Sequence, residues 1–248
     1  MAIPLLICDD SNMARKQVKK SLPAGWDVDI TFATNGQEGL EMIRQGKGEM
    51  VFLDLTMPEL DGFGVLTQLR EEGLSPEVIV VSGDVQEEAV RRAKALGARA
   101  FLKKPADPMQ LAEALNSLGV DVPLAPAPAT QDDIYRPLPN VSFRDAFREI
   151  SNVAMGRAAD LLGRVLGVFI KLPIPNVNIL EVGELHMALA DAQRDERLSA
   201  ICQGYIGGGI AGEALLIFHD SEIDDVAKLL NTQRDEGAQL EMQLDLAS

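Results

Sequence analysis

At 248 residues the chain is longer than most single domains, which predicts two domains. A composition of 46% hydrophobic and 25% charged residues is typical of a soluble globular protein, and no apolar run is long enough to cross a bilayer, so we expect a cytoplasmic protein without membrane contact. The formal net charge of −15 opposes binding to nucleic acid, and two distant cysteines, Cys8 and Cys202, indicate neither a disulfide framework nor a zinc site.

Residues 1–118 alternate short apolar runs with segments of helical periodicity. The apolar runs predict buried strands, and they read IPLLICDD, VDITFA, EMVFLDL, EVIVVSG and ARAFLKK. Strands that alternate with helices favour a parallel sheet covered on both faces, with right-handed crossovers. We therefore predict an α/β domain of the flavodoxin-like (βα)5 type, with a five-stranded parallel sheet.

Residues 119–141 are rich in proline and predict an extended, semi-rigid linker between two domains. Beyond it, the periodicity predicts a helix from about residue 142 to 168 and then a strand in KLPIPNVNILEV. LSAICQGYI and GEALLIF flank a glycine-rich turn as in a hairpin, and SEIDDVAKLLN predicts a short helix. Residues 142–248 are thus expected to form a smaller α+β domain.

Polar side chains stand at the carboxyl ends of the predicted parallel strands: Asp9 and Asp10, Asp54, Ser82 and Lys104. In an open α/β sheet this edge is where ligands bind, and clustered carboxylates suit Mg²⁺. A carboxylate left over can attack a phosphodonor, and the resulting acyl phosphate needs Mg²⁺ and a lysine as counterions. The alternative is a solvated rim without chemistry, which agreement at separate strand ends disfavours.

The motifs CDDS, VFLDLTMPELDG, VVSGD and FLKKP resemble the response-regulator receiver family over residues 1 to about 118. The resemblance implies that Asp54 is the phosphoacceptor and that Asp10 binds Mg²⁺ directly. It also implies that Asp9 assists through water and that Thr56 offers its backbone carbonyl to the metal.

The same resemblance makes Ser82 and Phe101 a switch pair, in which the hydroxyl moves toward the phosphate and the ring turns inward. Lys104 matches the lysine that binds the phosphoryl group. The implied partners are a sensor histidine kinase or a small phosphodonor.

In the second half, Asp145, Glu149 and Asn152 follow one another at helical spacing and share one face. Apolar side chains gather on the opposite face, and we expect that face to pack inward and the polar stripe to face solvent. The apolar residues are Phe147, Ile150, Ala154, Ala158, Leu161 and Val165. Ordinary amphipathicity explains such a stripe equally well.

The spacing of this stripe to Pro175, together with NVAMGRAADLLG, resembles the CheC, CheX and FliY phosphatases of phosphorylated receivers. The resemblance implies that Glu149 engages the receiver lysine and that Asn152 orients a water for attack on the acyl phosphate. Asp145 and Pro175 are implied to support the motif. The resemblance covers about one of the two pseudo-repeats usual in that family. We therefore expect either that the sequence is truncated or that residues 142–248 self-associate, which would make the protein a homo-oligomer.

The leading hypothesis is a response regulator phosphorylated on Asp54, fused to a phosphatase that acts on its own or a separate receiver. The alternative is a non-enzymatic adaptor whose binding to a chemotaxis or motility partner depends on phosphorylation. A transcription factor is disfavoured, because no basic recognition helix follows the linker.

Overall fold

The computed structural model describes residues 2–123, 140–178, 198–207 and 210–219, together with positions 181, 183, 184 and 187. The chain divides into two compact units, one formed by Met1–Gly163 with Phe169–Val177 and the other by Arg164–Val168 with Asn178–Ser248. Within the described residues, no helix has both the length and the apolar character needed to cross a bilayer. Most of the predicted linker and the helix predicted at SEIDDVAKLLN lie outside the described residues.

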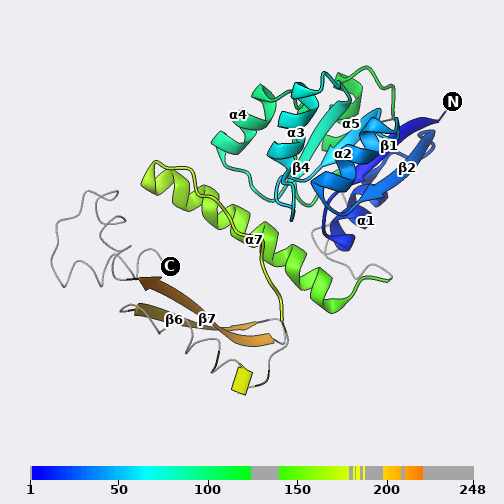
Figure 1. Ribbon diagram of the computed structural model, residues 1–248. Coiled ribbons are helices and arrows are strands. Elements are labelled where there is room, and N and C mark those ends of the chain that lie inside the picture. Colours follow the sequence, from blue (N-terminus) through cyan, green and yellow to red (C-terminus); the bar gives the residue numbers. More distant parts are fainter. Residues whose placement is uncertain are drawn as a thin grey trace. The chain divides into compact units, whose positions relative to one another are not determined.

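A five-stranded parallel sheet forms the centre of the first unit (Figure 1). Its strand order is β2-β1-β3-β4-β5, which is the doubly wound order of flavodoxin-like folds. The prediction of five parallel strands is therefore confirmed. The strands are β1 (Ile3–Cys8), β2 (Val28–Ala33), β3 (Met50–Leu53), β4 (Glu77–Ser82) and β5 (Ala100–Lys103).

Helices cover both faces of this sheet, because alternate side chains of each strand point to opposite sides. Two helices, α1 (Asn12–Ser21) and α5 (Pro108–Ser117), contribute Val18 and Leu111 to the core on one face. On the other face, α2 (Gly36–Arg44), α3 (Gly62–Glu71) and α4 (Glu87–Ala95) pack against Leu53 and Val80. The central strands are buried on both sides, as their continuous apolar sequence predicts.

Polar residues define where most of these helices begin. The side chains of Ser11, Asn35, Asp61 and Asp107 each accept a hydrogen bond from a first-turn N–H, which satisfies donors that have no partner inside the helix. Gln86, which precedes α4, makes no such capping bond. Its carboxamide has other partners, described below.

The helix α7 (Phe143–Leu166) agrees in its limits with the predicted helix. The expectation that its polar stripe faces solvent is wrong: Glu149 is 3% and Asn152 8% exposed, whereas Phe147 is 41% and Leu161 66% exposed. The physical reason is that the buried carboxylate finds a lysine partner in the sheet domain, which compensates its desolvation.

The segment after α7 differs from the prediction of a strand, because the described residues 171–178 have no regular structure. The predicted hairpin is present: β6 (Leu198–Gly207) pairs antiparallel with β7 (Ile210–His219). Prolines at positions 173 and 175 explain the irregular segment, since proline cannot donate to a strand ladder.

Candidate phosphoryl site

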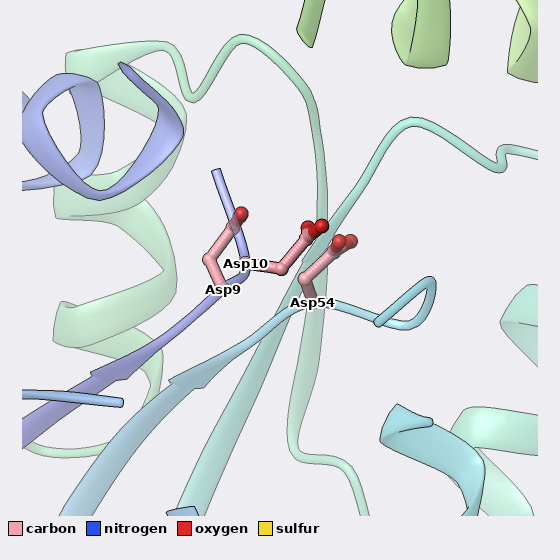
Figure 2. A group of neighbouring side chains, drawn as sticks. All are labelled: Asp9, Asp10 and Asp54. Carbon is pink, nitrogen blue, oxygen red and sulfur yellow. The ribbon is translucent and has the colours of Figure 1, made fainter. Parts of the chain in front are cut away.

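Three carboxylates meet at the carboxyl end of the sheet (Figure 2). Asp9 and Asp10 follow β1, and Asp54 follows β3. Because β1 and β3 are neighbours whose register pairs Cys8 with Leu53, the three side chains reach the same place. One oxygen from each lies within 4.8 Å of the other two. The juxtaposition predicted from strand ends is thus observed.

Lys104, directly after β5, lies among these carboxylates although it is only 5% exposed. Its Nζ is 2.7 Å from Oδ2 of Asp9, 3.2 Å from Oδ2 of Asp54 and 3.4 Å from Oε1 of Glu149. A buried ammonium group is tolerated only when it is paired, and here it serves three carboxylates at once. The site is therefore an ion cluster with negative charge in excess.

The burial of these groups changes their proton affinity. Burial raises the pKa of Asp54 to about 6, while Lys104 opposes the shift and Glu149 adds to it. Burial also raises the pKa of Asp9, against the charge of Lys104. For Lys104, burial alone would lower the pKa, but the carboxylates of Asp54, Asp9 and Glu149 raise it well above its ordinary value. Each carboxylate would be stabilised by a further cation.

A hard cation fits the arrangement. Oδ2 of Asp54 is buried and has no hydrogen-bond donor among the described residues, although Lys104 lies at ion-pair distance. Oδ1 accepts a hydrogen bond from the Leu55 N–H at 2.8 Å, which orients the carboxylate. Carboxylate oxygens gathered in this way are the ligands that Mg²⁺ prefers.

The other predicted receiver residues lie around this cluster. Ser82, at the end of β4, is fully buried, and its Oγ accepts a hydrogen bond from the Asp84 N–H at 3.2 Å. Phe101, on β5, is partly buried and packs against the core on the α2, α3 and α4 side. Thr56 is partly buried two residues after Asp54 and lines a hollow with Phe169 and Leu172.

The polar stripe of α7 meets the sheet domain beside the ion cluster. Asp145 accepts hydrogen bonds from the backbone N–H groups of Asn12 and Met13, at 3.3 and 3.1 Å. These are first-turn donors of α1, where a carboxylate is favourable. One turn further along α7, Glu149 reaches Lys104, and Asn152 is buried beyond it. All three stripe residues therefore face the sheet domain.

Arg148 was not foreseen as a site residue. Its Nη2 lies 3.0 Å from the carbonyl oxygen and 3.3 Å from Oδ2 of Asp10. Burial raises the pKa of Asp10, and the charge of Arg148 opposes that shift. Its place directly before Glu149 in the sequence is the feature from which this role could have been predicted. Arg148 thus places a second cation at a carboxylate of the candidate metal cluster.

Two glycines allow α7 to approach the loop after β4 closely. A Cβ added to Gly156 would lie 2.0 Å from the carbonyl oxygen of Gly83, and a Cβ on Gly83 would lie 3.3 Å from Cα of Val153. Gly156 stands four residues after Asn152 on the same helix face, which was a usable signal in the sequence. The contact is therefore backbone against backbone.

Pro175 lies near the start of α7. It lines a hollow together with Asn12, Asp145 and Arg148, among others. The structure therefore brings Pro175 close to the first part of the polar stripe.

Comparison with known proteins identifies the family of the sheet domain, residues 5–116. Residues 5–116 match the family model described as the response regulator receiver domain. The chemotaxis protein CheY of Thermotoga maritima is 34% identical over 115 residues, which are 46% of this chain and 95% of that protein. The nitrate/nitrite response regulator NarL of Escherichia coli is 34% identical over 113 residues, 45% of this chain. The chain spans 52% of that relative's length.

Solved structures give matches of similar extent. The receiver domain of the putative response regulator NarL from Mycobacterium tuberculosis is 25% identical, with a TM-score of 0.44 and coverage of 47% of this chain and 95% of that one. The CheX-CheY-BeF3-Mg+2 complex from Borrelia burgdorferi gives 28% identity and a TM-score of 0.43, over 47% of this chain and 89% of that one.

Proposed function

This chain belongs to the response regulator receiver family of two-component and chemotaxis signalling, and we propose that α7 carries a phosphatase acting on its own receiver. Asp54 is the proposed phosphoacceptor, loaded by a histidine kinase or a small phosphodonor in the cytoplasm. The observation that carries the proposal is the contact between Glu149 and Lys104, with Asn152 buried one turn further along the same face.

The receiver residues have complementary tasks in this proposal. Asp54 attacks the phosphorus of the phosphodonor through a carboxylate oxygen and becomes an acyl phosphate, while the bond from phosphorus to the donor's nitrogen or oxygen breaks and its electron pair leaves with the donor. Asp9, Asp10 and Asp54 would hold Mg²⁺, which supplies positive charge next to the phosphoryl oxygens. Lys104 adds a second positive charge from the other side of the cluster.

Hydrolysis then requires a positioned water more than an added base, because the acyl phosphate carries a good leaving group. Glu149 anchors α7 to Lys104. The carboxamide of Asn152 can accept a hydrogen bond from a water and donate to another oxygen, which orients the water for in-line attack. The water oxygen bonds to phosphorus, the bond to Asp54 breaks, and its electron pair returns to the carboxylate. A proton of the water passes to a phosphate oxygen or to solvent, and the product leaves as inorganic phosphate.

The contacts of Asp145 hold α7 against the sheet domain in the same position as the contact between Glu149 and Lys104 does. By accepting from the N–H groups of Asn12 and Met13, it fixes the start of α7 beside Asp9 and Asp10. The close approach of Gly156 to Gly83 fixes the helix on the other side of Asn152. Asn152 is thus held between two contacts, as a positioning task demands.

The test is the loss of phosphate from the full chain, loaded with acetyl phosphate and Mg²⁺. We expect Asn152→Ala to slow the loss by about a hundredfold, because the water is no longer oriented. Arg157→Ala, at an exposed position of the same helix, is the control and should match the wild type. A rate that does not change on dilution would place the reaction within one chain. Equal decay in wild type and Asn152→Ala would refute the phosphatase and leave α7 as a binding element.

A further inference from the structure

Gln86 is a buried receiver residue for which neither the fold nor the proposed chemistry accounts. It is 4% exposed and stands before α4 without capping that helix. Its carboxamide instead meets the segment after α7: Nε2 donates to the carbonyl oxygen of Ile170 at 2.8 Å, and the Ile170 N–H donates to Oε1 at 2.8 Å. The side chain therefore satisfies both backbone groups of one residue.

This pair of bonds depends on the carboxamide and not on the side chain of Ile170. The side chains of Asn and Gln carry a donor and an acceptor side by side on one neutral, planar amide, so they can pair with the N–H and C=O of one residue as a neighbouring strand does. Nε2 also donates to Oδ1 of Asp84 at 3.0 Å, which fixes the orientation of the amide. A glutamate of the same length has no donor for the carbonyl of Ile170.

Gln86 is also connected to the phosphoryl site by a short chain of hydrogen bonds. The Asp84 N–H donates to Oγ of Ser82 at 3.2 Å, and the Gln86 N–H donates to Oδ1 of Asp84 at 3.1 Å. Gly83, in the same loop, meets α7 at Gly156. This loop after β4 thus holds both α7 and the segment that follows it.

The segment Phe169–Val177 belongs to the same compact unit as the sheet domain. It lines a hollow with Thr56, Phe63 and Asp84 of the receiver. The hydrogen bonds described for the Gln86 side chain go to Asp84 and Ile170 and not to the ion cluster, so it can hold α7 in place without taking part in the reaction.

We propose that Gln86 is a specificity-determining residue: it clamps the backbone of Ile170 and thereby keeps α7 docked on the receiver of its own chain. The inference deepens the proposed function and rests on it for the consequence in phosphate loss. The clamp itself is a property of the unphosphorylated chain and has its own readout.

The experiment compares full-length wild type, Gln86→Ala, Gln86→Glu and the control Gln110→Ala, whose side chain is exposed on α5. Amide hydrogen exchange at Ile170 measures the clamp. We expect exchange to rise at least about tenfold in Gln86→Ala and in Gln86→Glu, because two bonds or their donor are lost, and to stay at the wild-type rate in the control.

Phosphate loss gives the second readout. Gln86→Ala should lose phosphate several-fold more slowly than wild type, roughly as the docked population falls. The double variant with Asn152→Ala should decay at the rate of Asn152→Ala alone, since Gln86 has no part in spontaneous hydrolysis.

Unchanged exchange at Ile170 in Gln86→Ala would overturn the proposal. Raised exchange with phosphate loss as fast as in wild type would overturn it too if Asn152→Ala still slows the loss, because the clamp would then not keep an active α7 docked. Failure of the proposed phosphatase has a different signature: Asn152→Ala would decay as the wild type does, and exchange at Ile170 would still decide whether Gln86 docks the segment.

Discussion

Replacing Gly156 by alanine sets two effects against each other. The added Cβ would lie 2.0 Å from the carbonyl oxygen of Gly83, and an ordinary contact between these atoms is about 3.3 Å. Since the obstacle is backbone, α7 must retreat by about 1.3 Å. That retreat carries Glu149 from 3.4 Å to beyond the roughly 4 Å limit of an ion pair with Lys104.

The loss of this contact should weaken docking by about 2 kcal/mol, less than for an isolated buried pair, because Lys104 keeps its other carboxylates. The helix alone should gain about 1 kcal/mol from alanine. We expect slower phosphate loss and faster amide exchange at Glu149, with helix content unchanged by circular dichroism. Arg157→Ala controls for a change in helix propensity at an exposed site. Wild-type phosphate loss together with wild-type exchange in Gly156→Ala would refute the close approach.

Arg148→Ala should tighten Mg²⁺ binding to the unphosphorylated chain by about five- to tenfold, because the variant removes a cation from beside Asp10. Titration calorimetry measures the dissociation constant of Mg²⁺, and a value equal to that of Arg157→Ala would contradict this prediction. Gly62→Ala should destabilise the receiver by about 2 kcal/mol in urea, since its Cβ would lie 2.2 Å from the backbone carbonyl of the proposed phosphoacceptor; an unchanged midpoint would argue against that packing. A thiol reagent should label exposed Cys202 in the native chain and buried Cys8 only in denaturant, as mass spectrometry can show; equal native labelling would rule out a buried β1.

The receiver half was predictable because its elements are strongly patterned. Continuous apolar runs such as Val78–Val81 are buried on both faces, and the polar residues that end the strands meet at one edge for purely topological reasons. Asp54 and Lys104 come together although they are 50 positions apart, because each directly follows a strand, β3 or β5, and only β4 lies between these strands in the sheet. Alternation of strands and helices sufficed for this inference.

The faces of α7 were predicted the wrong way round for an equally physical reason. Amphipathicity assumes that charged groups remain in water, and Glu149 remains buried because Lys104 supplies its counterion. That lysine lies 45 positions earlier in the chain, and the sequence pattern around Glu149 does not indicate that the two side chains are close in space. The strand predicted from residue 171 onward is absent from the described residues 171–178 for a local reason, because Pro173 and Pro175 cannot donate to a strand ladder.

By itself, the sequence determined the sheet domain, the order of its strands' polar ends and the limits of α7, because these depend on local periodicity and on the rules of parallel sheets. Tertiary structure alone decided which face of α7 is buried, that Arg148 meets Asp10 and that Gln86 meets Ile170. These contacts join residues far apart in the chain, and the balance between desolvation and pairing that selects them exists only once both partners are in place.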